Sequence, residues 1–185
     1  MRFVQTDIPG CTIVEIEPHE DERGFFARTW CRDEFDDAGL PSRLVQSSMS
    51  RNGKRGTTRG LHFQLPPSRE GKLVRCTSGA IFDVVVDVRS ASRSYLGHVS
   101  VELTAENCRA IYIPPGCAHG FQTLEEDTDV FYQMTDVFAP DLCAGLRWND
   151  PELAIDWPID KAIMNDRDSD YADLDRNWLG SLSWD

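Results

Sequence analysis

The sequence lacks any long apolar run, because no stretch of its 185 residues approaches the ~18 that a membrane-spanning helix needs. The opening segment MRFVQTDIPG does not resemble a signal peptide, since Asp7 and Pro9 interrupt any apolar core. Basic residues are also few: 19 Lys and Arg stand against 31 Asp and Glu, which gives a formal charge of −12. So negative a surface argues against nucleic acid or an anionic membrane as a partner. We therefore expect a cytoplasmic protein that binds neither.

Closely spaced cysteine pairs are absent as well. There are six cysteines and no CxxC pair, and the nearest two, Cys108 and Cys117, are nine residues apart. A chain of this length needs no disulfide to stabilise its core. We expect buried or half-buried free thiols, with a catalytic thiol as the less favoured alternative.

The sequence does contain many short alternating or β-branched segments separated by turn residues. The predicted strands cover residues 11–17, 24–30, 43–50, 60–64, 72–77, 80–88, 98–103, 109–113, 120–124 and 128–135. Only residues 32–38 and 151–155 have the pattern of short helices. Many short strands without long helices between them indicate a β-sandwich or barrel. We predict one mostly-β domain over residues 1–185.

Charge is distributed unevenly along the chain. Residues 51–75 hold seven basic groups and one acid, Glu70, whereas residues 150–185 hold ten acids and three bases. A basic segment in so acidic a protein is a candidate site for a small anion such as a phosphate. Arg59 and Lys72 are its strongest candidates, because both lie in apolar, strand-like contexts. The acidic end, from about residue 170 to 185, is expected to be a solvated surface.

Two histidines lie in contexts that suggest chemistry. In a strand, alternation places His62 and Gln64 on one face and Leu61 and Phe63 on the other, so only one face can pack into a core. His119 follows the rigid Pro-Pro-Gly turn that ends at residue 116.

A strand with HxQ and a later PxGxxH segment resemble the cupin barrels. Metal-binding cupins surround the ion with HxH, a Glu and a further His. Here Gln64 stands where the second His would be, and no Glu has the matching spacing. We expect no functional metal.

Three further side chains suggest a reaction class. Asp83 lies in the apolar segment 80–88, where a charge is rarely unpaired, and we predict that it pairs with Lys72. Tyr132 adds a weak acid, with an ordinary pKa of about 10. A histidine base, a fixed cation and a phenol suit abstraction of a proton beside a carbonyl. The base removes the proton, the cation stabilises the enolate, and the phenol reprotonates the other face. Such a reaction on a ketone needs no cofactor.

Seven segments in order resemble motifs of the dTDP-4-dehydrorhamnose 3,5-epimerases, jelly-roll cupins that act on nucleotide-linked 4-keto-6-deoxyhexoses. They span about residues 3–170 and are Asp21–Phe26 (DxRGxF), Arg59–Gln64 (RGLHxQ), Gly71–Arg75 (GKLVR), Gly79–Arg89 (GxxxDVxVDxR), Ile113–Phe121 (IPxGxAHGF), Trp148–Asp150 (WND) and Asp156–Pro158 (WP). The resemblance implies a cupin-type jelly-roll barrel with a few short helices. It also implies an epimerase that inverts C3 and C5 of a nucleotide-diphosphate sugar without a cofactor.

The resemblance further implies a role for individual residues. His62 corresponds to the general base, Asp168 to the carboxylate that orients it, Lys72 to the cation on the enolate oxygen, and Tyr132 to the opposing acid. The groups that would hold the diphosphate and sugar are Arg23, Arg59, His119 and Arg167, and those on the nucleotide side are Phe26 and Gln46. A segment of a second subunit completes the site in this family, so a homodimer is implied.

The chain departs from the family pattern at several positions expected around the substrate. Arg28 and Cys143 replace Glu, Ser48 replaces Asn, Phe138 replaces Tyr, and residues 165–168 read Asn-Asp-Arg-Asp in place of Ser-x-Lys-Asp. The segment 46–59 is one residue longer than is typical. The proton-transfer residues are unchanged. Two alternatives therefore stay open beside the 3,5-epimerase: a C3-only or C5-only epimerase, possibly on another nucleotide, and a non-catalytic sugar-binding cupin.

Overall fold

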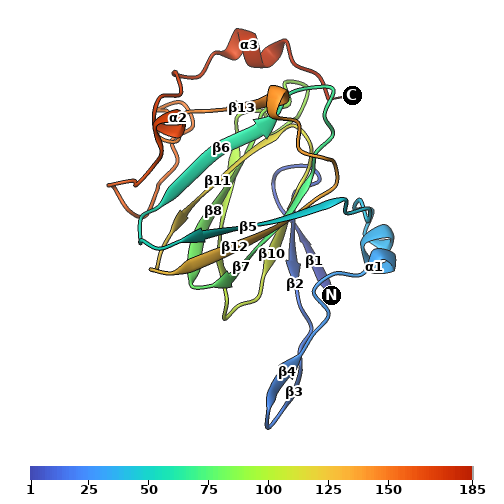
Figure 1. The fold of residues 1–185 in the computed structure, drawn as a ribbon. Helices are drawn as coiled ribbons and strands as arrows, with labels where there is room; N and C mark the ends of the chain where they lie inside the picture. Colours follow the sequence, from blue (N-terminus) through green and yellow to red (C-terminus); the bar gives the residue numbers. More distant parts are fainter. Residues whose placement is uncertain (185) are drawn as a thin grey trace.

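Two antiparallel sheets pack face to face around the core in the computed structural model, which describes residues 1–184 (Figure 1). The first sheet contains, in spatial order, β1 (Arg2–Gln5), β2 (Thr12–Glu15), β10 (Ala110–Ile113), β7 (Lys72–Ser78), β12 (Thr128–Met134) and β5 (Gln46–Asn52). The second contains β13 (Cys143–Gly145), β6 (Thr58–Gln64), β11 (Cys117–Thr123), β8 (Ala80–Asp87) and β9 (His98–Thr104). The predicted mostly-β, jelly-roll architecture is confirmed.

Strand alternation creates the core between the sheets. Val74, Ile111 and Val130 of the first sheet meet Val85 and Phe121 of the second, and each is at most 1% exposed. All six cysteines are free thiols, three buried and three half-buried, as predicted. Within residues 1–184, no helix is long and apolar enough to cross a membrane.

A second apolar cluster lies on the other face of the second sheet. Leu61 and Val84 contribute to it from β6 and β8, and the chain after residue 146 packs against them. Leu179, on α3 (Arg176–Gly180), is fully buried there, and Trp184 packs at the edge. The predicted solvated acidic surface is confirmed for Asp170, Asp173 and Asp175, which are exposed, but the apolar residues of the same segment pack against the sheet. Its apolar residues cover the sheet while its acids face outward or cap turns.

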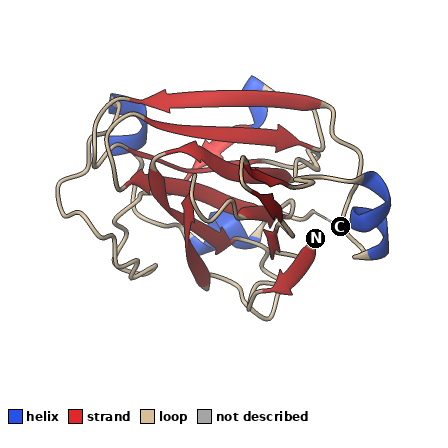
Figure 2. Ribbon diagram, turned by 90° about the horizontal axis from the view of Figure 1, so that it is seen from below, coloured by secondary structure: helices blue, strands red, loops and turns tan. Residues whose placement is uncertain are grey.

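The strand predictions for residues 72–77, 80–88, 98–103 and 128–135 agree with β7, β8, β9 and β12 to within one residue at each end. The helix predicted at 32–38 is α1 (Arg32–Asp37). The helix predicted at 151–155 is wrong, because that segment forms turns, and the helices near the end of the chain are α2 (Asp166–Ser169) and α3. Figure 2 shows the strands forming the body and the helices at its edges.

A hairpin of β3 (His19–Asp21) and β4 (Gly24–Phe26) projects away from the barrel (Figure 1). The predicted strand 24–30 thus ends at Phe26. Phe25 is 54% exposed and Phe26 is 77% exposed, so this hairpin presents aromatic rings to the surroundings. In contrast, the following helix α1 buries Phe35 against Phe3, with ring centroids 5.3 Å apart.

Candidate active site

A cavity of about 280 Å³ opens between the two sheets and brings together most of the predicted site residues. The predicted residues that line it are Gln46, Ser48, His62, Lys72, Tyr132, Cys143 and Arg167. Phe138, another departure from the family pattern, also lines it. A larger cavity of about 490 Å³ lies elsewhere, between the 89–91 and 114–115 turns and residues 180–184. We take the smaller cavity as the candidate site, because His62, Lys72 and Tyr132 line it together.

His62, on β6, is paired with Asp168 from α2, 106 residues further along the chain. Its Nε2 lies 2.8 Å from Asp168 Oδ1, and the other carboxylate oxygen accepts the Gly60 N–H at 3.1 Å. The Asn165 side chain caps α2 and accepts the Asp168 N–H at 2.8 Å. The carboxylate, 1% exposed, is thus held by His62 and the Gly60 N–H, while Asn165 holds its backbone.

The Asp168 carboxylate is favoured in its ionised form. Burial alone would raise the pKa of Asp168, but its hydrogen bonds with His62, the Gly60 N–H and Arg167 lower it below its usual range. An ionised carboxylate accepts the hydrogen on Nε2, and that tautomer leaves the imidazole Nδ1 unprotonated. Arg167 Nη2 also lies 2.9 Å from Nε2, but a guanidinium only donates, so in the tautomer that pairs with Asp168 this contact is not a hydrogen bond.

Lys72, the first residue of β7, forms an ion pair with Glu70 at 3.3 Å, and their side chains are 18% and 4% exposed. The predicted Lys72–Asp83 pair is wrong. Asp83 instead contacts His119 Nε2 at 2.8 Å, with both side chains buried. The reason is the topology: β8 and β11 are neighbours in the second sheet, whereas β7 belongs to the first. Glu70 lines the cavity and was missed, although it is the one acid among residues 51–75.

Tyr132, on β12, reaches the cavity from the sheet opposite His62. Its hydroxyl lies 3.4 Å from Ser50 Oγ, and burial raises the pKa of the phenol above its ordinary value. The His119 ring packs edge-on against the Tyr132 ring, with centroids 6.2 Å apart. His119 therefore lies behind the phenol, between it and Asp83.

Gly60 and Gly120 explain how the two histidine strands come so close. A Cβ on Gly60, whose φ is +113°, would lie 2.6 Å from Gly120 Cα. A Cβ on Gly120 would lie 2.7 Å from the Arg59 carbonyl oxygen. Neither strand can therefore carry a larger residue here without moving the other. The approach places His62 and His119 opposite each other in the register of β6 and β11.

Besides His119, four predicted substrate-binding residues do not line this cavity. Arg23 and Phe26 are on the projecting hairpin, where Arg23 contacts Asp21 at 2.5 Å. Arg28 pairs with Glu34 of α1 at 2.8 Å. Arg59 is exposed, and its Nε donates to Asn52 Oδ1 at 2.8 Å.

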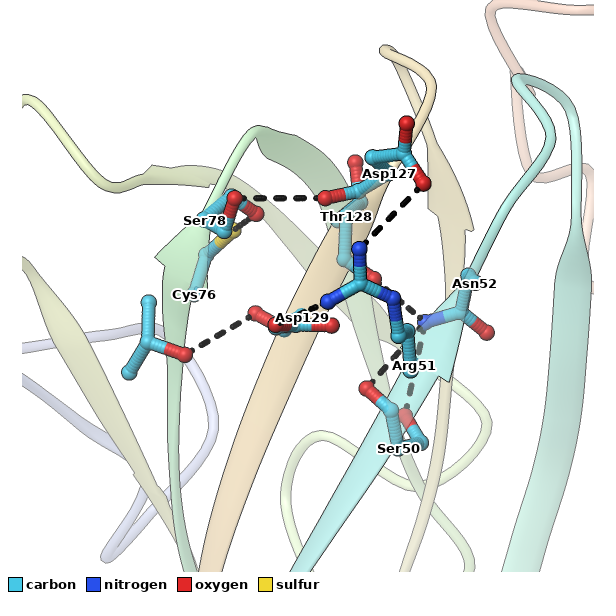
Figure 3. Close-up of polar contacts among 9 residues, drawn as sticks. Ser50, Arg51, Asn52, Cys76, Ser78, Asp127, Thr128 and Asp129 are labelled. Atoms are coloured by element: carbon cyan, nitrogen blue, oxygen red, sulfur yellow. Dashed lines mark hydrogen bonds and ion pairs between the residues drawn. The ribbon is translucent and has the colours of Figure 1, made fainter.

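The basic residues of segment 51–75 lie in several different places, and the anion site with Arg59 and Lys72 stays a prediction. Arg51 lies 3.4 Å from both Asp127 and Asp129 at the start of β12, and Figure 3 shows the two contacts. Arg75 is buried and donates to the Thr29 carbonyl at 2.7 Å. Alternation along β7 sends Lys72 and Arg75 to opposite faces of the sheet, so only Lys72 reaches the cavity.

Within residues 1–184, no cluster of three or more His, Cys, Asp or Glu side chains is arranged to hold a metal ion. The groups in the cavity that can move a proton or hold a charge include a base with an orienting carboxylate, a cation and a phenol. Such an arrangement can remove a proton, hold a developing oxyanion and return a proton from the opposite side.

Comparisons with known proteins identify the family of this chain. A family profile described as dTDP-4-dehydrorhamnose 3,5-epimerase matches residues 5–176. An enzyme of that name from Methanothermobacter thermautotrophicus is 41% identical over 179 residues, which cover 95% of this chain and 96% of the relative. A Bacillus anthracis dTDP-4-dehydrorhamnose 3,5-epimerase, solved with TDP and PPi bound, is 35% identical, with a TM-score of 0.91 and coverage of 94% and 99%. A Legionella pneumophila dTDP-6-deoxy-D-glucose-3,5-epimerase, solved with dTDP-4-keto-L-rhamnose, is 36% identical, with a TM-score of 0.85 and coverage of 91% and 89%. The chain belongs to the dTDP-4-dehydrorhamnose 3,5-epimerase family.

Proposed function

We propose that this protein is an isomerase that inverts C3 and C5 of dTDP-4-dehydro-6-deoxyglucose and so yields dTDP-4-dehydrorhamnose. The observation that carries the proposal is the His62–Asp168 pair, which faces the same cavity as Lys72 and Tyr132. The family profile and the relatives near 40% identity bear the 3,5-epimerase name, which favours this reaction over inversion of a single carbon.

In the proposed reaction, three side chains that line the cavity each have one role. His62 Nδ1 takes the proton from a carbon beside the C4 ketone, while Asp168 stabilises the imidazolium that forms. The Lys72 ammonium holds the C4 oxygen as its negative charge develops. Tyr132, on the opposite sheet, gives its proton to the other face of the same carbon. Both C3 and C5 flank one carbonyl, so one base and one cation serve both inversions.

The remaining groups in and beside the cavity are proposed to hold the substrate. Arg167 and Arg59 carry the positive charge for the diphosphate, and Gln46, Ser48 and Cys143 line the mouth of the cavity. Gln46 Oε1 accepts the Phe138 N–H at 3.2 Å, which fixes the segment that borders the nucleotide side. His119 supports the Tyr132 ring from behind.

Deuterium exchange followed by NMR tests the function. With catalytic amounts of enzyme in D₂O, we expect dTDP-4-dehydro-6-deoxyglucose to lose the signals of both protons, on C3 and on C5. One carbon should exchange distinctly faster, because Phe138 and Cys143 lack the polar groups usual at their positions, and a misplacement of ~1 Å can cost about 100-fold in rate. Exchange at one carbon only, even at high enzyme, would establish a mono-epimerase. Binding without exchange would establish a sugar-binding cupin.

We also propose that the protein is a homodimer in which the β3–β4 hairpin completes the partner's site. Arg23 and Phe26 lie on a projection that does not reach the cavity of its own chain, and Phe26 is 77% exposed. A cation and an aromatic ring are the groups that a nucleoside diphosphate would need.

A mixing experiment tests the exchange of hairpins. His62→Ala lacks the base, and the double variant Arg23→Ala/Phe26→Ala lacks the hairpin contacts, so each homodimer should be nearly inactive. Mixed and refolded together, they should recover about a quarter of the wild-type activity, because half of the dimers are mixed and each has one intact site. No recovery, with dimers present by light scattering, would contradict the exchange.

A further inference from the structure

A chain of hydrogen bonds runs from Arg59 to Tyr132 beside the cavity. Arg59 Nε donates to Asn52 Oδ1 at 2.8 Å, and Asn52 Nδ2 lies 3.4 Å from Ser50 Oγ. Ser50 Oγ in turn lies 3.4 Å from the Tyr132 hydroxyl. Asn52 and Ser50 are both on β5, next to β12, and Figure 3 shows the contacts of the Asn52 side chain with Ser50 and Thr128.

The orientation of the Asn52 amide is fixed by its neighbours. A guanidinium only donates, so Oδ1 must face Arg59. A backbone carbonyl only accepts, and the Thr128 carbonyl lies 3.1 Å from Nδ2. Both contacts require the same orientation of an amide that is 2% exposed.

This orientation gives the chain a direction. Asn52 Nδ2 donates a hydrogen bond to Ser50 Oγ, so the hydrogen of the Ser50 hydroxyl is free to be donated to the Tyr132 oxygen. Every donor then points from the Arg59 cation toward the phenol, and hydrogen bonds in such a series polarise one another. The arrangement suits a negative charge on the Tyr132 oxygen better than a neutral hydroxyl, because a phenolate only accepts.

We propose that Ser50 and Asn52 are positioning residues that stabilise the Tyr132 phenolate left behind when this group reprotonates the substrate. The proposal rests on the proposed function, in which Tyr132 is the acid. Burial disfavours a phenolate, as the raised pKa of Tyr132 records. A donor aimed at that oxygen offsets part of this cost. The relay, by which we mean the hydrogen bonds from Arg59 through Asn52 and Ser50 to Tyr132, therefore favours the step that completes an inversion.

The relay predicts an effect that a structural role would not produce. Exchange into solvent needs only His62 and Lys72, because the base can take a proton, exchange it and return it to the same face. Inversion additionally needs Tyr132. Weakening the relay should therefore lower inversion while exchange continues, whereas a loosened fold would lower both in proportion.

The experiment measures exchange and inversion together in D₂O with dTDP-4-dehydro-6-deoxyglucose. In Ser50→Ala and in Asn52→Asp, which keeps a partner for Arg59 but has no amide donor, the ratio of inversion to exchange should fall about tenfold, the size expected for a hydrogen bond to a charged group. Ser50→Thr keeps the hydroxyl and should restore the ratio. Ser78→Ala is the matched control, since its hydroxyl binds the Asp127 carbonyl at 3.2 Å, away from the phenol.

The outcomes separate the relay from the proposed function. The wild type could show both exchange and inversion while the ratio of inversion to exchange stays unchanged in Ser50→Ala and Asn52→Asp. That result would overturn the relay and leave the proposed function standing. A proportional loss of both rates in the two variants would also overturn it. Absence of exchange in the wild type would overturn the proposed function and the relay with it. Melting temperatures close to that of the wild type would show that the variants are folded.

Discussion

His62→Ala is expected to lower deuterium exchange at C3 and C5 by about 10²–10⁴-fold, the usual contribution of a general base, and to change nucleotide-sugar affinity only a few fold. The reason is that His62 is the base that reaches the cavity together with a buried carboxylate, Asp168, at 2.8 Å. The His119 imidazole cannot replace it, because its Nε2 contacts Asp83 and its ring lies behind Tyr132.

His98→Ala supplies the matched control for this substitution. His98 lies on β9, at the edge of the second sheet, and should tolerate the change without loss of exchange. The measurement is NMR of the C3 and C5 protons in D₂O, with affinity for dTDP measured by calorimetry. Near-wild-type exchange in His62→Ala would remove His62 from the role of base. A parallel loss of affinity and exchange would indicate that the pocket had been disrupted.

Strand alternation predicted the cavity face correctly but not its contacts. The period of two placed His62 and Gln64 opposite Leu61 and Phe63, and the structure buries Leu61 and Phe63 in the outer cluster. The same reasoning could not say which strands become neighbours. It therefore paired Lys72 with Asp83, whereas the topology gives Asp83 to His119 and leaves Lys72 with Glu70.

Contacts between distant parts of the chain could be predicted only from the family resemblance. Nothing local in residues 165–168 indicates that Asp168 meets a histidine 106 residues earlier, and the motif order supplied that pairing. The packing of the end of the chain was missed for a physical reason: the ten acids among residues 150–185 dominated the composition. A few apolar side chains, among them Leu179 and Trp184, decide the packing by covering the second sheet. The net charge of a segment describes its exposed surface, whereas its buried apolar residues determine which part of the protein it packs against.

The cavity also balances its charges. The cations Lys72 and Arg167 face the carboxylates of Glu70 and Asp168, and each carboxylate is at most 4% exposed in its side chain. In the proposed reaction the enolate therefore forms beside cations that are already held in place. Such fixed groups need no reorganisation when the oxyanion develops, which is the main source of their effect on the rate.

Lys72→Met is the second substitution with a large expected effect. It should lower exchange at C3 and at C5 by the same factor, about 10²–10³-fold, which is typical for loss of a group that stabilises an oxyanion. Two unit charges about 4 Å apart contribute about 4 kcal/mol at an effective dielectric constant of about 20, and Glu70 offsets part of this. The factor should be equal because both reactions pass through enolates of one C4 ketone, whose oxygen the same ammonium holds.

Lys54→Met is the control, because Lys54 is exposed and lies in the same basic segment. It should leave both exchange rates unchanged. The two rates are measured separately by NMR in D₂O, at saturating substrate, so that a change in binding does not enter. Loss at one carbon only would mean that Lys72 holds the sugar for that inversion and does not stabilise a shared enolate. Since the C4 carbonyl is the group common to both steps, equal loss is the result that would place Lys72 at the carbonyl oxygen.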